Sequence, residues 1–274
     1  MSFEPWIAPD HPDVVWFRGA DAIGFLNDLV SQEVASMEVG EVRRSLFLRP
    51  KGKLDQILWV LRGDGEVGLV AEEGRGAELA ASIGRFRIRV DVDITQETQP
   101  TWVIIGSTEF DPGRWRPFDG GLSADVSWAG VSRTLIVGNR PTVAEGEAGE
   151  YERLRILAGE PRWGIDVDEK TIPQEAGLVS VSVDFKKGCY LGQELVARIH
   201  NRGHVNRHLR ILELDNAADA GAAITSGENE VGVLTSVVDR VGLGLVRREI
   251  EPGSSVQVGA ATAKVLAVPS KPQT

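Results

Sequence analysis

The chain has 274 residues, 42% of them hydrophobic, so it is long enough to bury two or three compact cores and too apolar to be disordered. Its formal net charge of −10 argues against a protein that binds duplex nucleic acid, because such proteins carry a basic excess. A single cysteine excludes an internal disulfide and any metal site built from several thiolates of one chain.

The first 17 residues contain no basic region followed by an apolar run, so the sequence predicts no signal peptide. No apolar run reaches the roughly 18 residues that a membrane helix needs. A lone cysteine also fits a reducing compartment. We therefore expect a soluble, cytoplasmic protein with neither membrane nor nucleic acid as a partner.

The first hundred residues alternate apolar strands with two helices. Asp21 stands where the first helix should begin, and aspartate is a good N-cap residue. The order of strand, helix, two strands, helix and strand suggests a ferredoxin-like unit over residues 1–100. We predict strands at 13–17, 45–48, 54–61, 67–71 and 86–94, helices at 22–30 and 76–83, and a glycine-bearing turn at 50–53.

Two further parts follow along the chain. Residues 101–206 form the second part, and residues 207–274 read as a small C-terminal β-barrel with a frayed tail at 270–274, because short strands alternate there with glycine turns. Strands are predicted at 102–105, 121–128, 132–137, 209–214, 231–238, 241–246, 255–258 and 263–268, and a helix at 151–157.

The stretch from Val179 to Arg202 contains the cysteine. Alternating apolar residues predict a strand over 179–185, and a helical spacing of apolar residues begins at Leu195. Cys189 falls in the turn between them, flanked by glycines and near Lys187, with the helix expected within a residue or two. A nearby cation and a helix N-terminus both favour the thiolate. The alternative is that Cys189 is a small packed hydrophobe.

Residues 187–194, KGCYLGQE, resemble the KGCYxGQE signature of the YgfZ-type folate-binding proteins, which are relatives of the T-protein of the glycine cleavage system, an aminomethyltransferase. Residues 19–34 and 41–62 resemble the opening of the T-protein, and residues 154–175 carry a related G-x-P, G-x-D, P-x-E pattern. The resemblance implies an α+β fold, with a T-protein-like body of ferredoxin-like halves followed by a small C-terminal β-barrel.

The same resemblance implies a cofactor, a function and a set of residues. The cofactor would be tetrahydrofolate or a related reduced folate, and the function would be that of an accessory protein in the assembly or repair of iron–sulfur clusters. The partners would be iron–sulfur enzymes or cluster carrier proteins, since one cysteine cannot hold a cluster alone. The implied catalytic residues are Cys189 and Lys187, and the implied folate contacts are Asp55, Glu175, Tyr190, Gln193, Arg198 and Arg202.

Two other functions stay open. The T-protein has a pair of aspartates after its glycine turn, whereas this chain has Asp55 followed by Gln56, and an amide cannot exchange a proton as a carboxylate does. This argues against an active aminomethyltransferase. A folate sensor without chemistry fits the sequence as well. The histidines at 200, 204 and 208 are spaced for one helix face, but Gly203 interrupts the pattern, and we predict no metal site.

Overall fold

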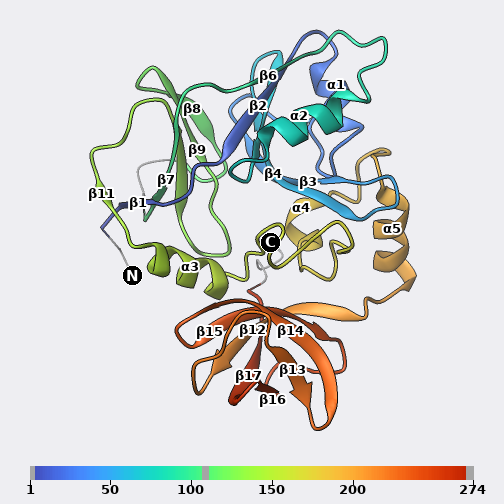
Figure 1. Ribbon diagram of the computed structural model, residues 1–274. Coiled ribbons are helices and arrows are strands. Elements are labelled where there is room, and N and C mark those ends of the chain that lie inside the picture. The colour runs from blue at the N-terminus through green and yellow to red at the C-terminus, as the bar shows by residue number, and fades with distance from the viewer. Residues whose placement is uncertain (1–3, 107–110, 270–274) are drawn as a thin grey trace. The chain divides into compact units, whose positions relative to one another are not determined.

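The computed structural model describes residues 4–106 and 111–269 (Figure 1). The chain divides into two compact units, the first formed by residues 1–147 and 181–193 and the second by residues 148–180 and 194–274. Each unit is described by itself, and the division into parts at residues 100 and 206 stays a prediction. In the part of the chain that is described, no helix is long and apolar enough to cross a membrane.

A five-stranded antiparallel sheet forms the centre of the first unit. Its strand order is β3-β4-β5-β2-β6, so β6, β2, β5 and β4 have the order of a ferredoxin-like sheet and β3 adds an edge. The elements are β2 (Asp13–Arg18), α1 (Ala22–Asn27), β3 (Val42–Leu48), β4 (Leu54–Arg62), β5 (Glu66–Ala71), α2 (Gly76–Gly84) and β6 (Asp93–Gln96). The hairpin and both helices were predicted from the sequence.

Both faces of this sheet are covered, which explains why its strands are nearly continuous apolar runs. The helices α1 and α2 lie on one face of the sheet (Figure 1). There Val15 and Phe17 pack in a core with residues of both helices. On the other face Val14 and Trp16 pack against residues of a second sheet. Successive side chains of β2 thus enter two different cores, as the period of a strand requires.

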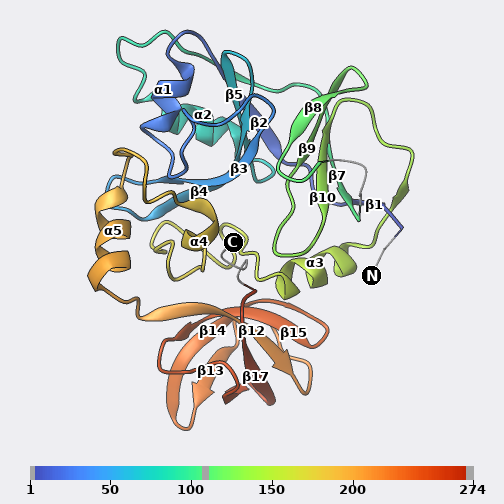
Figure 2. The ribbon, with the colours of Figure 1, turned by 180° about the vertical axis from the view of Figure 1, so that it is seen from behind.

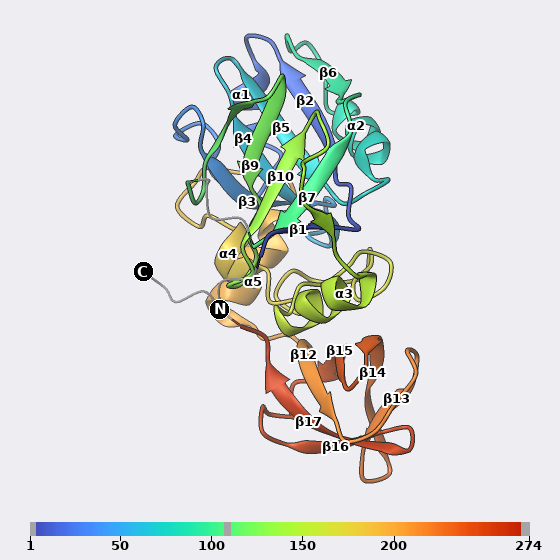
Figure 3. The same ribbon diagram turned by 90° about the vertical axis from the view of Figure 1, so that its left-hand side faces the viewer.

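The second sheet has six strands in the order β11-β1-β7-β10-β9-β8 (Figure 3). Its central strands are antiparallel, and β1 from the start of the chain lies between β7 and β11. Leu122 and Leu135 face the five-stranded sheet in the shared core. The strands are β1 (Trp6–Ala8), β7 (Thr101–Ile105), β8 (Trp115–Phe118), β9 (Gly121–Asp125), β10 (Arg133–Val137) and β11 (Ala144–Glu145).

A closed six-stranded barrel dominates the second unit, as predicted (Figure 2). Its core is filled by aliphatic side chains such as Leu212 and Val265. The helix α3 (Ala148–Leu157) packs Ile156 against Leu209 and Leu243 of the barrel. The strands are β12 (Arg207–Leu214), β13 (Ala223–Ser226), β14 (Asn229–Val238), β15 (Val241–Arg247), β16 (Ser255–Val258) and β17 (Ala261–Ala267). The tail at 270–274 lies outside the described residues.

Three local predictions were wrong. Residues 85–89 are exposed, and β6 begins only at Asp93, because the chain after α2 turns back on the helix end instead of pairing with a neighbour. The predicted strand at 179–185 is the one-turn helix α4 (Val179–Ser182). Asp21 occupies the N-cap of α1, but its carboxylate accepts a hydrogen bond from Asp91 N and makes none to its own helix.

Candidate functional site

The turn that follows α4 is fixed to the loop after α1 at both of its ends. Asp184 N donates to Ser31 O at 3.0 Å, and Leu191 N donates to Asp28 O at 3.1 Å. The buried hydroxyl of Ser31 donates to Ser182 O at 2.6 Å. Segments about 150 residues apart in sequence are therefore joined by hydrogen bonds, each of which contributes on the order of 1 kcal/mol.

Lys187 makes further hydrogen bonds between the turn and the loop after α1. Its ammonium donates to three backbone carbonyls, Asn27 O at 2.5 Å, Val30 O at 2.7 Å and Gln32 O at 2.9 Å. Burial lowers the pKa of Lys187 to about 8, although Glu33 and other nearby carboxylates oppose the shift. An ammonium has three donors, so all three are used in holding the loop. Lys187 thus attaches the turn to the loop, and its predicted catalytic role stays a prediction.

Cys189 is exposed, as predicted for a reactive thiol. The helix α5 (Gln193–Arg202) begins four residues after it, and not within one or two, so the expected stabilisation by the helix dipole falls away with that distance. Gly188 has open space where a side chain would lie. The turn therefore presents the sulfur to solvent without crowding it.

Gly192 shows why the turn needs its second glycine. Its φ is +80°, and a Cβ there would lie 2.5 Å from Arg49 O and 3.0 Å from the Leu48 Cβ. A larger residue would meet the backbone of the β3–β4 hairpin, so only glycine permits this approach. The turn thus packs closely on the hairpin at Gly192.

Tyr190 and Gln193 also have contacts inside the turn. The Tyr190 side chain is buried, and the Lys187 Nζ lies 5.3 Å from the centre of its ring. Tyr190 N donates to Gln193 Oε1 at 3.3 Å, and Gln193 N donates to Tyr190 O at 3.3 Å. Both residues therefore close the turn, and their predicted contacts with folate stay predictions.

A hollow of about 390 Å³ lies beside the hairpin turn in the first unit. This volume falls within the usual range of small-molecule sites. Leu191, from the cysteine turn, contributes to its wall, so the hollow adjoins the motif. Its lining consists of Phe47, Leu48, Arg49, Pro50, Asp55, Glu78, Ser82, Arg85, Phe86 and Leu191.

Asp55 is the buried carboxylate of this hollow, with 8% of its surface exposed. The pKa of Asp55 is raised, mainly because the carboxyl group is buried and in part because Glu78 is near. Arg49 opposes this shift, with its Nη2 at 3.6 Å from Asp55 Oδ1. A carboxyl group with a raised pKa is better suited to exchange protons near neutral pH. Gln56 accepts a hydrogen bond from Arg75 Nε at 3.1 Å through its side chain, so the amide is committed to another partner.

The remaining predicted residues lie in the second unit. Glu175 is buried, and its carboxylate accepts hydrogen bonds from Ile172 N at 3.0 Å and Arg207 Nε at 3.3 Å. Arg198 and Arg202 are exposed on α5, four residues apart and hence on one face of the helix. The first unit thus brings together Cys189, Lys187, Tyr190, Gln193 and the Asp55 hollow, while Glu175 and the two arginines belong to the second.

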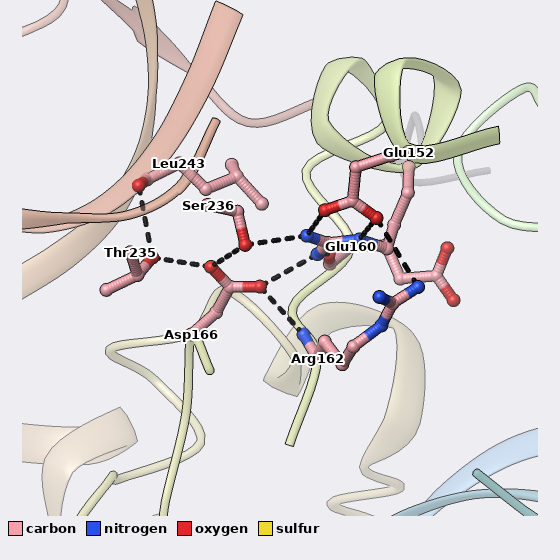
Figure 4. A network of polar contacts seen from close by, with 8 residues as sticks. Glu152, Glu160, Arg162, Asp166, Thr235, Ser236 and Leu243 are labelled. Carbon is pink, nitrogen blue, oxygen red and sulfur yellow. Dashed lines mark hydrogen bonds and ion pairs between the residues drawn. The ribbon is translucent and has the colours of Figure 1, made fainter. Parts of the chain in front are cut away.

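Part of the pattern at 154–175 has a structural role. Asp166 is buried and accepts hydrogen bonds from Arg155 Nη1 at 2.8 Å, from Arg162 N at 2.9 Å and from Ser236 Oγ at 2.8 Å (Figure 4). Thr235 Oγ1 also donates to it. Although burial would lower the pKa of Arg155, its bonds to the carboxylates of Glu152 and Asp166 raise that pKa above its usual value. The network joins α3, the loop after it and the barrel.

The histidines do not share a helix. His200 lies on α5, whereas His208 lies on β12. Within residues 4–106 and 111–269, no three histidine, cysteine, aspartate or glutamate side chains are placed to hold a metal ion.

Four lining residues of the hollow were missed by the sequence reading. Glu78, Ser82, Arg85 and Phe86 come from α2 and from the turn after it. The run of alternating arginine and apolar residues at 85–89 was a signal, but residues 86–94 were interpreted as a strand. Three arginines among the apolar side chains of this segment are better explained if the segment lies on the protein surface, because arginine is rarely buried without a partner.

Comparison with known proteins explains this arrangement. The fold is that of the glycine cleavage system aminomethyltransferase T from Bartonella henselae, whose structure matches with a TM-score of 0.84 at 18% identity, covering 97% of this chain and 85% of that one. Residues 206–272 match the family model of the CAF17 C-terminal beta-barrel domain.

Similar sequences span most of the chain. An iron-sulfur cluster assembly factor IBA57 homolog of Phaeosphaeria nodorum is 24% identical, covering 95% of this chain and 67% of the relative. A tRNA-modifying protein YgfZ of Vibrio atlanticus is 25% identical, covering 83% and 79%. The chain is a homologue of the YgfZ and IBA57 proteins. It is also related to an aminomethyltransferase of Rubrobacter xylanophilus, at 28% identity over 90% of this chain and 77% of the relative. The chain thus has the aminomethyltransferase fold and is similar in sequence to YgfZ and IBA57 proteins.

Proposed function

We propose that this chain binds tetrahydrofolate or a related reduced folate and acts through Cys189 in the assembly or repair of iron–sulfur clusters on partner proteins. The observation that supports this most strongly is the exposed thiol, which lies in a turn that the half-buried Lys187 attaches to the loop after α1 and that adjoins the Asp55 hollow. The names of the IBA57 and YgfZ relatives support the direction of the proposal. We propose the cytoplasm as its compartment, because an exposed thiol stays reduced there.

The residues of the hollow fit the chemistry of a reduced folate. The pterin ring carries hydrogen-bond donors that suit the carboxylates of Asp55 and Glu78, and Phe47 and Phe86 offer apolar ring surfaces. Arg49 can pair with the anionic tail. When bound, the folate would supply a one-carbon carrier, while this chain would orient it and hold a proton at Asp55.

Binding can be tested by thermal unfolding with tetrahydrofolate. A ligand at 100 times its dissociation constant stabilises the native state by about 2.7 kcal/mol, which should raise the Tm. In the Asp55→Ala variant the rise should be much smaller, and in Lys264→Ala, an exposed change in the barrel, it should be unchanged. A wild-type Tm that does not move with ligand would contradict folate binding.

The role in cluster assembly is tested in a deletion strain by the activities of several iron–sulfur enzymes. The wild-type chain should restore them, and Cys189→Ser should not. Full restoration by Cys189→Ser, together with folate binding by the purified protein, would favour a folate sensor.

Aminomethyl transfer is the second candidate, favoured by the fold and by the aminomethyltransferase relative. Gln56 argues against it, because its amide cannot act as a proton donor or acceptor beside Asp55. Steady turnover of an aminomethylated lipoyl carrier by the purified chain, abolished by Asp55→Asn, would establish it. We expect no such turnover.

A further inference from the structure

We propose that the exposed segment Arg85–Arg89 is a docking surface for an acidic, partly apolar segment of a protein partner. This inference rests on the proposed function, since it names the surface that would hold the partner of that function beside the Asp55 hollow. The exposure, the charge and the local geometry of these five consecutive residues support it. None of these three observations depends on Cys189.

Exposure sets this segment apart. All five residues from Arg85 to Arg89 are exposed, with Phe86 at 37% and Ile88 at 72%. Among the exposed large hydrophobic side chains of residues 4–106 and 111–269, these two alone lie within two residues of each other. Single exposed hydrophobics are ordinary on a protein surface, but an apolar pair framed by cations is typical of an interface.

The charge of the segment opposes that of the whole chain. Three arginines stand at 85, 87 and 89, with no acid among the five residues, in a chain of net charge −10. Arg87 pairs with Asp93 at 3.7 Å, but their side chains are 46% and 82% exposed, so this ion pair is weak and can be exchanged for a partner's carboxylate. Arginine binds carboxylates through two parallel hydrogen bonds, and it is enriched at interfaces.

The backbone holds the segment in one shape. Phe86 N donates to Ile83 O at 2.9 Å and Arg87 N to Gly84 O at 3.1 Å, which fixes the turn to the end of α2. Arg89 has a φ of +56°, an uncommon conformation for a residue with a side chain. A surface that is ordered before binding loses less conformational entropy when a partner docks.

The same segment is continuous with the hollow. Phe86 and Phe47 make an edge-to-face contact with ring centres 6.5 Å apart, and both line the hollow together with Arg85. A partner segment on Arg87, Ile88 and Arg89 would therefore lie next to the mouth of the site. This is where a protein that receives the product of the site's chemistry should be held.

An acidic protein segment fits this surface better than a nucleic acid does. Ile88 is the more exposed of the two apolar side chains, Phe86 and Ile88, and it has no ring on which a base could stack. Three cations are few for a polyanion, and the net charge of −10 repels one at longer range. A protein segment with carboxylates next to leucine or isoleucine matches both the positive charge and the apolar side chains of this surface.

The test is fluorescence anisotropy with three labelled probes: a short peptide of alternating glutamate and leucine, the matching peptide of glutamate and glycine, and a short single-stranded RNA. The glutamate–leucine peptide should bind best, and its binding should weaken as salt rises. The double variant Arg87→Glu with Arg89→Glu should weaken binding at least about tenfold, and Ile88→Ser by several-fold. The matched control is Arg153→Glu with Arg240→Glu, which makes the same charge change at two exposed positions of the second unit and should have no effect.

Two outcomes would overturn the proposal. One is peptide binding that is absent in the wild type or equal in both double variants. The other is tighter binding of the RNA that is lost in the Arg87 and Arg89 variant, which would make the surface a nucleic-acid site. The Tm shift with tetrahydrofolate, measured on the same variant, separates this inference from the proposed function. We expect that shift to be retained, because neither Arg87 nor Arg89 lines the hollow.

Discussion

Lys187 in the first unit and Asp166 in the second are both charged groups removed from water, and they are held in different ways. Asp166 has a buried arginine as its counterion and two hydroxyl donors, so its charge is balanced inside the network (Figure 4). Lys187 is bound by carbonyls, which carry no net charge, and its turn leaves a thiol exposed. Nearby carboxylates offset the cost of burying Lys187 only in part, because its pKa is still lowered to about 8, and such costs are common at functional sites. The comparison therefore sets a stabilising network beside the turn that we propose to be functional.

The largest effect should come from Asp166→Ala. Removing one partner of a buried ion pair typically costs about 3–5 kcal/mol. Arg155 would keep only Glu152 as a counterion, and Arg162 N and the hydroxyl of Ser236 would lose their acceptor. Urea unfolding followed by circular dichroism should show this loss. Glu169→Ala, three residues away and exposed, should change stability by less than about 0.5 kcal/mol. A loss for Asp166→Ala as small as that of the control would mean that the network does not stabilise the unit.

Gly192→Ala should have the next largest effect. The new Cβ would lie 2.5 Å from a backbone oxygen in a left-handed conformation, and the two penalties together should cost about 2–3 kcal/mol. Gly188→Ala is the matched control, because open space surrounds that position. If both variants melt at the same temperature, the contact with the hairpin is not rigid.

Lys187→Met should cost about 1–2 kcal/mol at pH 7, because three carbonyls lose their donor. Lys186→Met, at an exposed neighbour, is the control. The pKa of Lys187 is lowered from 10.5 to about 8, so between these values the unfolded chain binds the proton more tightly. The stability that Lys187 contributes should therefore rise with pH across this window.

The predicted rise with pH is tested by the difference in unfolding free energy between the wild type and Lys187→Met, measured from pH 7 to pH 11. A difference that shrinks above pH 8 would show that the carbonyl bonds to the ammonium outweigh its burial.

Cys189→Ser should have the smallest effect on stability, within about 0.5 kcal/mol, since the side chain is exposed. It should nevertheless fail to restore the iron–sulfur enzymes of a deletion strain. We further expect the native thiol to be alkylated at pH 7 without denaturant, because its side chain is exposed. A thiol that reacts only after denaturant is added would contradict both its exposure and its proposed role.

Much of the local structure could be predicted because it depends on neighbours in sequence. The hairpin around residues 50–53, the helix at 76–83 and five of the six barrel strands follow from periodicity and turn residues. The missed strand, β13, buries only Ile224 fully, so it carries almost no apolar pattern. Residues 86–92 and 179–185 have the period of a strand but pair with no neighbouring strand, and pairing is a property of the fold.

The sequence by itself predicted the aminomethyltransferase-like fold, the C-terminal barrel and the turn that exposes Cys189, since each has a short pattern in one stretch of the chain. Only the tertiary structure decided what Lys187, Gly192 and Asp166 do. Their partners are carbonyls, a hairpin turn and barrel hydroxyls that lie far away in sequence and have no side-chain signature of their own. Any residue supplies a backbone carbonyl, so the acceptors of Lys187 could not be found before the chain was folded.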